Sequence, residues 1–163
     1  MTNSPIGIPT PHGTFAATYS QAGLCRLEFP EKVTPPKTNP TLTGLAKRWH
    51  ANAAKALKTM LLGQAPGNLP PLDLSSGTEF QISVWRQLLQ IPHGQARSYG
   101  ELAGRLGKPG ASRAVGSACG ANPIPVIVPC HRVLAAHGRI GGFSGGPGWK
   151  QSLLKIEGTP FIE

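Results

Sequence analysis

The residues with the clearest chemical potential are Cys130 and His131, which follow the apolar run Pro125–Val128 and are followed at once by Arg132. A thiol beside an imidazole and a guanidinium lies in positive electrostatic potential, which favours the thiolate, the nucleophilic form of cysteine. The alternative interpretation is a small buried cysteine with two surface cations after it. The spacing therefore indicates a candidate nucleophile with a candidate base beside it, and its use depends on the elements that position it.

The composition limits the kind of protein in which this cysteine acts. The chain has 163 residues, of which 39% are hydrophobic, enough for one domain of ordinary size or a small domain joined to a subdomain. Its cysteines, Cys25, Cys119 and Cys130, are odd in number and widely spaced, so they indicate neither a disulfide framework nor a zinc motif. The sequence shows no secretory signal and no run near the roughly 18 apolar residues that a membrane span needs. We therefore expect a cytoplasmic protein without a metal ion or a membrane contact.

Basic residues outnumber acidic ones by 16 to 7, and the excess is larger in the second half. Residues 1–79 hold seven basic and four acidic side chains, a net charge of +3, whereas residues 80–163 hold nine and three, a net charge of +6. Scattered positive charge suits a polyanionic partner, because each phosphate contact releases counterions. Solubility alone is the alternative explanation, and the charge does not decide between the two.

The first half alternates short apolar segments with turn residues, a pattern typical of a small antiparallel sheet. The predicted strands are Ile6–Ile8, Thr14–Tyr19 and Leu24–Phe29. A proline-rich linker, Glu31–Pro40, leads into a helix that begins at Thr43 and carries apolar residues at three- and four-residue steps. A second Pro/Gly/Ser-rich connection, Gln64–Ser76, marks the predicted boundary between an N-terminal domain of residues 1–76 and a C-terminal domain of residues 77–163.

The second half carries the signals of several short helices. Thr78–Gln81 and Ser98–Glu101 each fit a capping box, in which the first and last side chains exchange hydrogen bonds with the helix N-terminus. Gly107–Gly110 breaks the second helix, and Ser112 is predicted to cap a third that runs to about Ala121. Two short helices joined by a tight glycine-containing turn have the proportions of a helix-turn-helix. The prediction is therefore an α+β fold: a small N-terminal α/β subdomain of short antiparallel strands plus a helix, then a mostly helical C-terminal domain.

The third of these helices is made almost entirely of small residues, with Arg113 as its only long polar side chain. The small residues are Ser112, Ala114, Gly116, Ser117, Ala118 and Gly120. Each glycine costs such a helix up to about 1 kcal/mol, which makes sense where something approaches its backbone closely. Either a neighbouring helix packs tightly against it, or the helix enters the minor groove of DNA, about 6 Å wide, with Arg113 at its leading end.

Two further features bear on the chemistry of Cys130. The glycine-rich loop Gly141–Gly148 exposes many backbone amides, but it contains neither the G-x-G-x-x-G pattern nor the Walker A pattern, so we exclude nucleotide binding. Glu157, at the end of a predicted last helix that starts near Trp149, is one of three acidic residues in the second half. It is either a plain surface residue or the carboxylate that orients His131.

Taken together, these motifs resemble the methylated-DNA–protein-cysteine methyltransferases, also called O6-alkylguanine-DNA alkyltransferases. The resemblance is dense from Thr78 to Gly158 and looser over the first half, whose order of strands, linker and helix is also that of the family. The motifs that carry it are Ser98-Tyr99-x-Glu-Leu-Ala103, Ser112-Arg-Ala-Val-Gly116, Asn122-Pro-Ile-Pro-Val-Ile-Val-Pro-Cys-His-Arg-Val133, Phe143-Ser-Gly-Gly146 and Glu157-Gly158. The pentapeptide Pro-Cys-His-Arg-Val, preceded by Asn-Pro, is the most specific of them.

The resemblance implies direct repair of double-stranded DNA by a monomeric protein that needs no cofactor. Cys130 would take the alkyl group from O6 of guanine in one irreversible displacement, so each protein molecule would react once. His131 would act as the base for the thiol, through a water in family members, with Glu157 orienting the imidazole. The damaged guanine has to leave the base stack, because a side chain cannot reach O6 of a stacked guanine in line. The helix-turn-helix would bind the minor groove.

The same resemblance implies roles for further positions. Tyr99 corresponds to a tyrosine that helps to rotate the nucleotide and donates to the guanine, Arg113 to an arginine finger that fills the stack, and Asn122 to a hinge. The residues expected at DNA or substrate are Tyr99, Ser112, Arg113, Ala114, Gly116, Asn122, Pro125, Arg132, Val133, Phe143, Ser144 and Gly145.

Several of these positions would surround the guanine. The carbonyls of Cys130 and Val133 would accept hydrogen bonds from its amine, and the amide of Ser144 would face O6. Pro125 would line the alkyl pocket. Phe143 stands where some family members have a tyrosine, so a hydroxyl donor is absent there while the aromatic contact remains.

Three other functions remain open on the sequence alone. A DNA-binding relative without transfer activity would have another residue in place of Cys130. A Cys-His hydrolase would need an oxyanion hole and access for water, and it would leave the basic half and the small-residue helix unexplained. A plain DNA-binding regulator would leave Cys130, His131 and Glu157 without a purpose.

Overall fold

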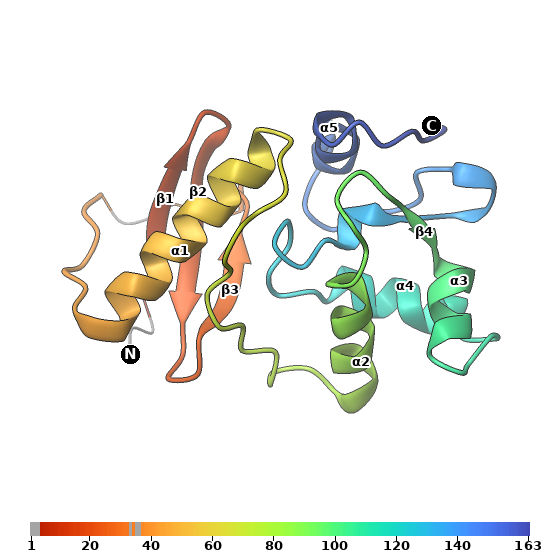
Figure 1. Cartoon of the computed structure of the whole chain (residues 1–163), viewed down its shortest axis with the longest axis horizontal. Helices are drawn as coiled ribbons and strands as arrows, with labels where there is room; N and C mark the ends of the chain where they lie inside the picture. The colour runs from red at the N-terminus through yellow and green to blue at the C-terminus, as the bar shows by residue number, and fades with distance from the viewer. Residues whose placement is uncertain (1–3, 33, 35–36) are drawn as a thin grey trace.

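The N-terminal part of the molecule is a three-stranded antiparallel sheet covered by one long helix (Figure 1). In the computed structural model, which describes residues 4–32, 34 and 37–163, the strands are β1 (Ile6–Thr10), β2 (Gly13–Tyr19) and β3 (Leu24–Glu28). Ala17 of β2 pairs with Ile6 of β1 and with Leu27 of β3, so β2 is the middle strand. The three strands predicted from the sequence are confirmed, although β1 ends at Thr10 rather than at Ile8, β2 begins one residue earlier and β3 ends one residue earlier than predicted.

The long helix α1 (Gly44–Leu61) packs its apolar stripe on this sheet. Trp49, Ala53 and Leu57 recur at four-residue steps and are buried together with the apolar side chains of the strands. The predicted linker 31–40 includes residues 33, 35 and 36, which lie outside the described residues, and its other residues form neither a helix nor a strand. The predicted domain boundary between residues 76 and 77 stays a prediction.

The C-terminal part is mostly helical, which confirms the predicted α+β class. Its elements are α2 (Glu79–Leu88), β4 (Arg97–Ser98), α3 (Tyr99–Arg105), α4 (Ser112–Gly120), the 3-10 helix η1 (Cys130–Arg132), β5 (Val133–Leu134), the 3-10 helix η2 (Ala136–Gly138) and α5 (Trp149–Ile156). Helices α3 and α4 pack side by side and form the predicted helix-turn-helix pair, and α4 also packs on α2 (Figure 1).

Both predicted capping boxes are present, and they set where α2 and α3 begin. The Thr78 hydroxyl accepts from the Gln81 amide at 3.1 Å, while Gln81 Oε1 accepts from the Thr78 amide at 3.0 Å. Ser98 and Glu101 exchange the same pair of hydrogen bonds at 3.0 and 2.9 Å. Each box satisfies two backbone donors that the first helical turn would otherwise leave unpaired.

The start of α4 differs from the prediction. Ser112 was expected as the N-cap, but it is the first residue of the helix, and Ala111 takes the N-cap position without a side-chain hydrogen bond. The Ala111 amide donates to the Lys108 carbonyl at 2.9 Å, and the Ala111 carbonyl accepts from the Val115 amide at 2.9 Å. The turn of the helix-turn-helix therefore runs directly into α4, one residue earlier than the capping rule suggested.

The β-branched run before η1 is a buried turn and not a strand. Pro123, Pro125 and Pro129 have no amide hydrogen, so this segment cannot join a ladder of backbone hydrogen bonds. The Val128 amide donates instead to the Ile124 carbonyl at 2.9 Å, which closes the turn. The turn leads straight into η1.

One short pairing was not predicted from the sequence. Arg97 of β4 pairs in parallel with Val133 of β5, and Ser98 pairs with Leu134. Strands of two residues are too short to show an alternating pattern. The pairing ties the start of α3 to the end of η1, and so it joins the helix-turn-helix to the segment that carries the candidate nucleophile.

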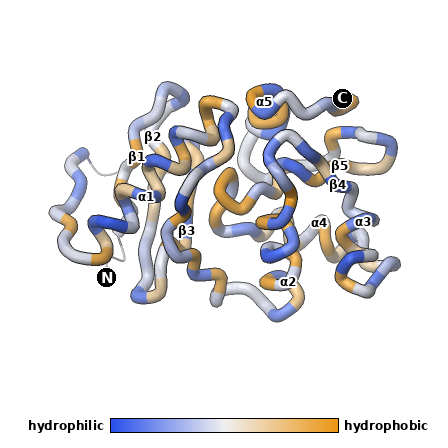
Figure 2. The backbone as a smooth tube through the Cα atoms, viewed as in Figure 1, coloured by the Kyte–Doolittle hydropathy of each residue, from blue (hydrophilic) through white to orange (hydrophobic). Residues whose placement is uncertain are grey.

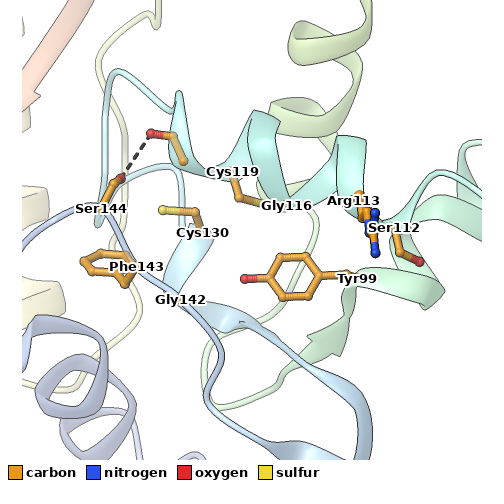
Figure 3. A pocket seen from close by; sticks show the side chains of 10 residues that line it. Tyr99, Ser112, Arg113, Gly116, Cys119, Cys130, Gly142, Phe143 and Ser144 are labelled. Carbon is orange, nitrogen blue, oxygen red and sulfur yellow. Dashed lines mark hydrogen bonds between the residues drawn. The ribbon is translucent and has the colours of Figure 1, made fainter.

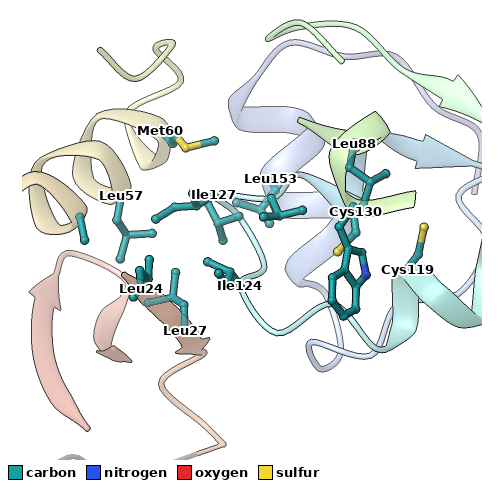
Figure 4. Close-up of a cluster of buried hydrophobic side chains, with 14 of the residues drawn as sticks. Leu24, Leu27, Leu57, Met60, Leu88, Cys119, Ile124, Ile127, Cys130 and Leu153 are labelled. Atoms are coloured by element: carbon teal, nitrogen blue, oxygen red, sulfur yellow. The ribbon is translucent and has the colours of Figure 1, made fainter. Parts of the chain in front are cut away.

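The two parts of the chain share one hydrophobic core (Figure 4). Leu27 of β3 and Leu57 of α1 lie beside Ile124 and Ile127 of the turn before η1. Their backbones are joined as well, because the Leu27 amide donates to the Pro123 carbonyl at 2.9 Å.

Hydrophilic and hydrophobic residues alternate along the helices (Figure 2). Across the described ranges, none of the helices has both the length and the apolar character that crossing a membrane requires.

We expect Trp85→Phe to destabilise the protein by about 2 kcal/mol, from one lost hydrogen bond and some lost buried area. Trp85 of α2 is 2% exposed, and its indole N–H donates to the Ala118 carbonyl of α4 at 2.8 Å. Urea unfolding of wild type and variant measures the difference. Trp49→Phe is the control, because no hydrogen bond from the Trp49 indole is found among the described residues. Equal losses for both variants would show that the bond to α4 contributes nothing.

Candidate functional site

Cys130 lies where two cavities meet, and it is only 5% exposed. The first, which we call the α4 cavity, measures about 470 Å³ and lies between α3, α4 and the glycine-rich loop (Figure 3). The second, the β3 cavity, measures about 400 Å³ and lies between the same loop, the turn before η1 and β3. A group that enters either cavity can therefore approach the thiol.

Burial keeps the Cys130 thiol protonated. It raises the pKa of Cys130 above its ordinary value, and a hydrogen bond from the Asn122 side chain, the charge of Lys150 and nearby backbone amides offset this only in part. The stabilised thiolate expected from the sequence is therefore wrong for this structure. The thiol needs a base before it can act as a nucleophile.

Glu157 accepts hydrogen bonds from two neighbouring side chains in the interior. Its Oε1 lies 2.9 Å from His131 Nε2 and 2.8 Å from Arg132 Nη2, and its Oε2 lies 2.9 Å from Arg132 Nε. Arg132 also donates from Nη1 to the Ile91 carbonyl at 2.8 Å. His131, Arg132 and Glu157 are all buried. Arg132 lines neither cavity, and three of its N–H groups are bound to Glu157 and to the Ile91 carbonyl, so its predicted contact with DNA or substrate stays a prediction that these bonds do not favour.

These hydrogen bonds decide which groups carry charge. Burial raises the pKa of Glu157, but the hydrogen bonds and charges of His131 and Arg132 outweigh it and lower that pKa to about 2. Burial lowers the pKa of His131, and the hydrogen bond and charge of Glu157 offset this only in part. At neutral pH Glu157 is therefore ionised and His131 is neutral.

The neutral imidazole of His131 carries its hydrogen on a defined nitrogen. Because an ionised carboxylate only accepts hydrogen bonds, Nε2 must hold the hydrogen that faces Glu157. Nδ1 then has a free lone pair, and this buried atom has no hydrogen-bond partner within the described part of the chain. Such a nitrogen is suited to accept a proton from the neighbouring thiol.

Asn122 fixes the turn that ends at the nucleophile. Its Nδ2 donates to the Val128 carbonyl at 2.7 Å, and its Oδ1 accepts from the Ile124 amide at 2.9 Å. The same side chain hydrogen-bonds to Cys130 and so lowers the cost of forming the thiolate. One amide thus holds the geometry of the turn and favours ionisation of the thiol.

Tyr99 stands between α4 and the glycine-rich loop, with its hydroxyl directed into the α4 cavity (Figure 3). A Cβ at Gly116 would lie 3.8 Å from Tyr99 Cε1, and one at Gly141 would lie 3.6 Å from Cε2, so the backbone on both sides approaches the ring closely. Burial raises the pKa of Tyr99 to about 12. The hydroxyl therefore stays protonated and can donate a hydrogen bond.

Most of the remaining residues predicted at DNA or substrate line one of the two cavities or both. The structure brings Tyr99, Ser112, Arg113 and Gly116 to the α4 cavity, Asn122, Pro125 and Gly145 to the β3 cavity, and Phe143 and Ser144 to both. Ala114 lies outside both cavities, exposed on α4. Val133 is fully buried in β5 and lines neither cavity.

Lys150 of α5 is a site residue that the sequence pattern did not single out. It is 1% exposed, and its Nζ donates to the Gly142 carbonyl at 3.3 Å and lies 5.7 Å from the centre of the Tyr99 ring. Burial lowers the pKa of Lys150. A signal existed, because Lys150 precedes Leu153 and Leu154 by three and four residues and so shares their buried helical stripe.

A second thiol, Cys119 of α4, also lines the α4 cavity. Burial raises its pKa to about 12, so it is a weaker candidate nucleophile than an ordinary cysteine. Over residues 4–32, 34 and 37–163, no three His, Cys, Asp or Glu side chains lie close enough together to hold a metal ion.

The fold and the site define a class: a helix-turn-helix protein in which a buried cysteine is followed by a histidine bonded to a glutamate. Residues 79–159 match the family described as 6-O-methylguanine DNA methyltransferase, DNA binding domain. A methylated-DNA–protein-cysteine methyltransferase of Mycolicibacterium paratuberculosis is 48% identical over 120 residues, which cover 72% of each chain. The chain belongs to the methylated-DNA–protein-cysteine methyltransferase family, as the motifs indicated.

Two further comparisons define the extent of this likeness. A Mycobacterium bovis protein of the same name is 57% identical over 86 residues, 53% of this chain and 52% of the relative, so this chain spans about half the length of that relative. The crystal structure of Mycobacterium tuberculosis OGT in complex with DNA has a TM-score of 0.77 at 39% identity, and the match covers 93% of this chain and 90% of that one. The likeness in fold therefore includes the N-terminal sheet.

We expect Glu157→Gln to destabilise the fold by roughly 3 kcal/mol near neutral pH, because it leaves Arg132 as a buried charge without a counter-ion. This difference should shrink in acid. The pKa of Glu157 is depressed from 4.5 to about 2 on folding. Its stabilising contribution is therefore complete above the unfolded pKa and is lost as the pH falls through that range.

Urea unfolding of both proteins at about pH 6 and about pH 3 measures this effect. Glu163→Gln, a change to the exposed last residue of the chain, serves as the control for loss of a carboxylate. A gap between wild type and Glu157→Gln that is as wide at the lower pH would contradict the assignment.

Proposed function

We propose that this protein repairs O6-alkylguanine in double-stranded DNA by transferring the alkyl group to its own Cys130, once and irreversibly. The arrangement at Cys130 carries the proposal: a protonated thiol where two cavities meet, next to a neutral His131 that Glu157 orients. The curated relatives share the name methylated-DNA–protein-cysteine methyltransferase, which supports it.

The reaction needs a thiolate, which forms when substrate is present. His131 Nδ1 takes the proton of the thiol, directly or through a water, and ionised Glu157 stabilises the imidazolium. The sulfur attacks the alkyl carbon; the S–C bond forms as the C–O6 bond breaks, and the electron pair stays on the guanine. The Tyr99 hydroxyl donates to the guanine as this negative charge develops. The product is a thioether, a poor leaving group, so the protein is consumed.

Lys150 contributes by its charge. Its ammonium is fixed by the Gly142 carbonyl beside the Tyr99 ring, and it lowers the pKa of Cys130. The same charge favours the anionic guanine as the C–O6 bond breaks, since the ammonium lies next to Tyr99 and Gly142, which both line the α4 cavity. A buried cation in this place makes proton transfer from the thiol easier without a permanent thiolate.

DNA reaches the site across α4, and the damaged guanine leaves the stack to enter the α4 cavity, because an in-line attack on a stacked base is sterically blocked. Arg113 is exposed at the first turn of α4 and lines this cavity, which supports a role in filling the gap in the stack. The small side chains of α4 suit the narrow minor groove. The net charge of +9 supports binding to phosphates. The protein acts as a monomer in this proposal.

Transfer of label tests the proposal directly. Incubation with a duplex that carries radiolabelled O6-methylguanine should place one label on each protein molecule, at Cys130, with no second turnover. Peptide mapping by mass spectrometry locates the label. Cys130→Ser should take up none, whereas Cys25→Ser, in β3, should behave as wild type. Label that stays on the DNA, or repeated turnover such as a hydrolase would show, would refute the proposal.

The role of Arg113 predicts a difference between substrates. Arg113→Ala should slow transfer from duplex DNA roughly tenfold, in line with the stacking energy of a single base, because nothing then replaces the flipped guanine. Its reaction with free O6-benzylguanine should be nearly unchanged, since no stack is involved. Rates of protein alkylation with both substrates measure this. Arg105→Ala, an exposed charge on α3, is the control. Equal slowing on both substrates would remove the proposed role.

A further inference from the structure

The glycine-rich loop Gly141–Gly148 forms part of both cavities but does not fix its own conformation. Phe143 and Ser144 in this loop line the α4 cavity and the β3 cavity. The loop contains neither helix nor strand, and ordering a flexible backbone has an entropic cost for each residue. Contacts from elsewhere in the molecule must therefore hold it where substrate is bound.

The aromatic side chain of Phe29, the residue directly after β3, packs against this loop. Its ring centre lies 5.9 Å from that of Phe143 in an edge-on arrangement and 4.7 Å from that of Trp149. A Cβ at Gly145 would overlap the rings of Phe29 and Phe143, so the loop backbone is pressed against them. Phe29 is buried, and Phe15 of β2, 5.5 Å away, anchors it in the sheet.

Two polar side chains that follow Phe29 bind the same region. Lys32 Nζ donates to the Ser144 carbonyl, and Glu31 Oε2 accepts from Trp149 Nε1 at 2.9 Å. On its other side the loop is bonded to α4, because the Ser144 hydroxyl donates to the Gly120 carbonyl at 3.1 Å (Figure 3). Ser144 is thus held between the N-terminal part and α4.

We propose that the segment Phe29–Lys32 is a clamp that holds the glycine-rich loop in its reactive position, so that Phe29, Glu31 and Lys32 are positioning residues for alkyl transfer. This rests on the proposed function, because the clamp governs the rate of that reaction. It acts through the loop. When the backbone of Ser144 is fixed, the side of the cavity that contacts the guanine is fixed as well, and the alkyl group is held at a constant distance from the thiol. The N-terminal part thereby takes part in the chemistry without supplying a reacting group.

The clamp can be loosened without unfolding the protein. Lys32 is exposed, so its loss removes the hydrogen bond to Ser144 and opens no cavity in the core. The N-terminal sheet stays joined to the rest of the molecule through the bond from the Leu27 amide to the Pro123 carbonyl and through the shared core. Lys32→Met is therefore the informative variant, since it keeps an unbranched side chain and removes only the ammonium.

For Lys32→Met we expect alkyl transfer to slow roughly fivefold, the effect of about 1 kcal/mol, with duplex DNA and with free O6-benzylguanine alike. Hydrogen exchange of the amides in residues 141–148 should become faster in the protein without DNA. Lys32→Arg keeps a donor and should restore both. Lys55→Met, on α1, removes the same charge away from the loop and controls for a general loss of attraction to phosphates.

Two results would overturn the clamp. One is an unchanged transfer rate and unchanged loop exchange in Lys32→Met. The other is slowing with duplex DNA alone, which would make Lys32 a phosphate contact. These outcomes differ from failure of the proposed function, in which the wild-type protein itself would transfer no label to Cys130.

Discussion

The site depends above all on one buried carboxylate that two side chains share. Taking a charge out of water is costly, and Glu157 stays ionised in the interior because His131 and Arg132 both donate to it. Arg132 supplies the compensating positive charge, so His131 does not have to. A histidine that alone neutralised the carboxylate would already carry its second proton. Here His131 stays neutral and keeps a lone pair with which it can act as a base.

The same interaction also fixes geometry, because its members come from separate segments. Glu157 ends α5, Arg132 belongs to η1, and the Ile91 carbonyl that Arg132 also binds follows α2. A carboxylate and a guanidinium with two parallel hydrogen bonds have little freedom to rotate. The imidazole of His131 is therefore oriented by a cross-link between three parts of the fold, and the β4–β5 pairing adds the helix-turn-helix to them.

Features that depend on neighbours in the sequence could be predicted, and those that depend on burial could not. Thr78 and Ser98 cap their helices through residues three positions away, so the spacing alone sufficed. Arg132 follows Cys130 by two positions in the sequence, but its guanidinium is bound to Glu157 and to the Ile91 carbonyl, so it does not line the cavities at the thiol. The protonated state of Cys130 follows from the segments packed around it, which no local pattern reports. The stripe that Lys150 shares with Leu153 and Leu154 indicates its burial, but its place beside Tyr99 depends on how the segments pack.

Burial of the thiol would work against an enzyme that needs a permanent thiolate, but it suits the single reaction that we propose for this protein. Thiolates combine with oxidants and electrophiles far more readily than thiols do. At Cys130 the raised pKa keeps the sulfur in its less reactive form, and the adjacent residue, His131, keeps an unpaired Nδ1 that takes the proton in the proposed reaction. In the proposed reaction the negative charge then moves from sulfur to guanine, so the buried site never has to hold a thiolate at equilibrium. If each molecule reacts once, as proposed, the desolvation that makes the thiol a poor acid also protects a nucleophile that the protein has no means to regenerate.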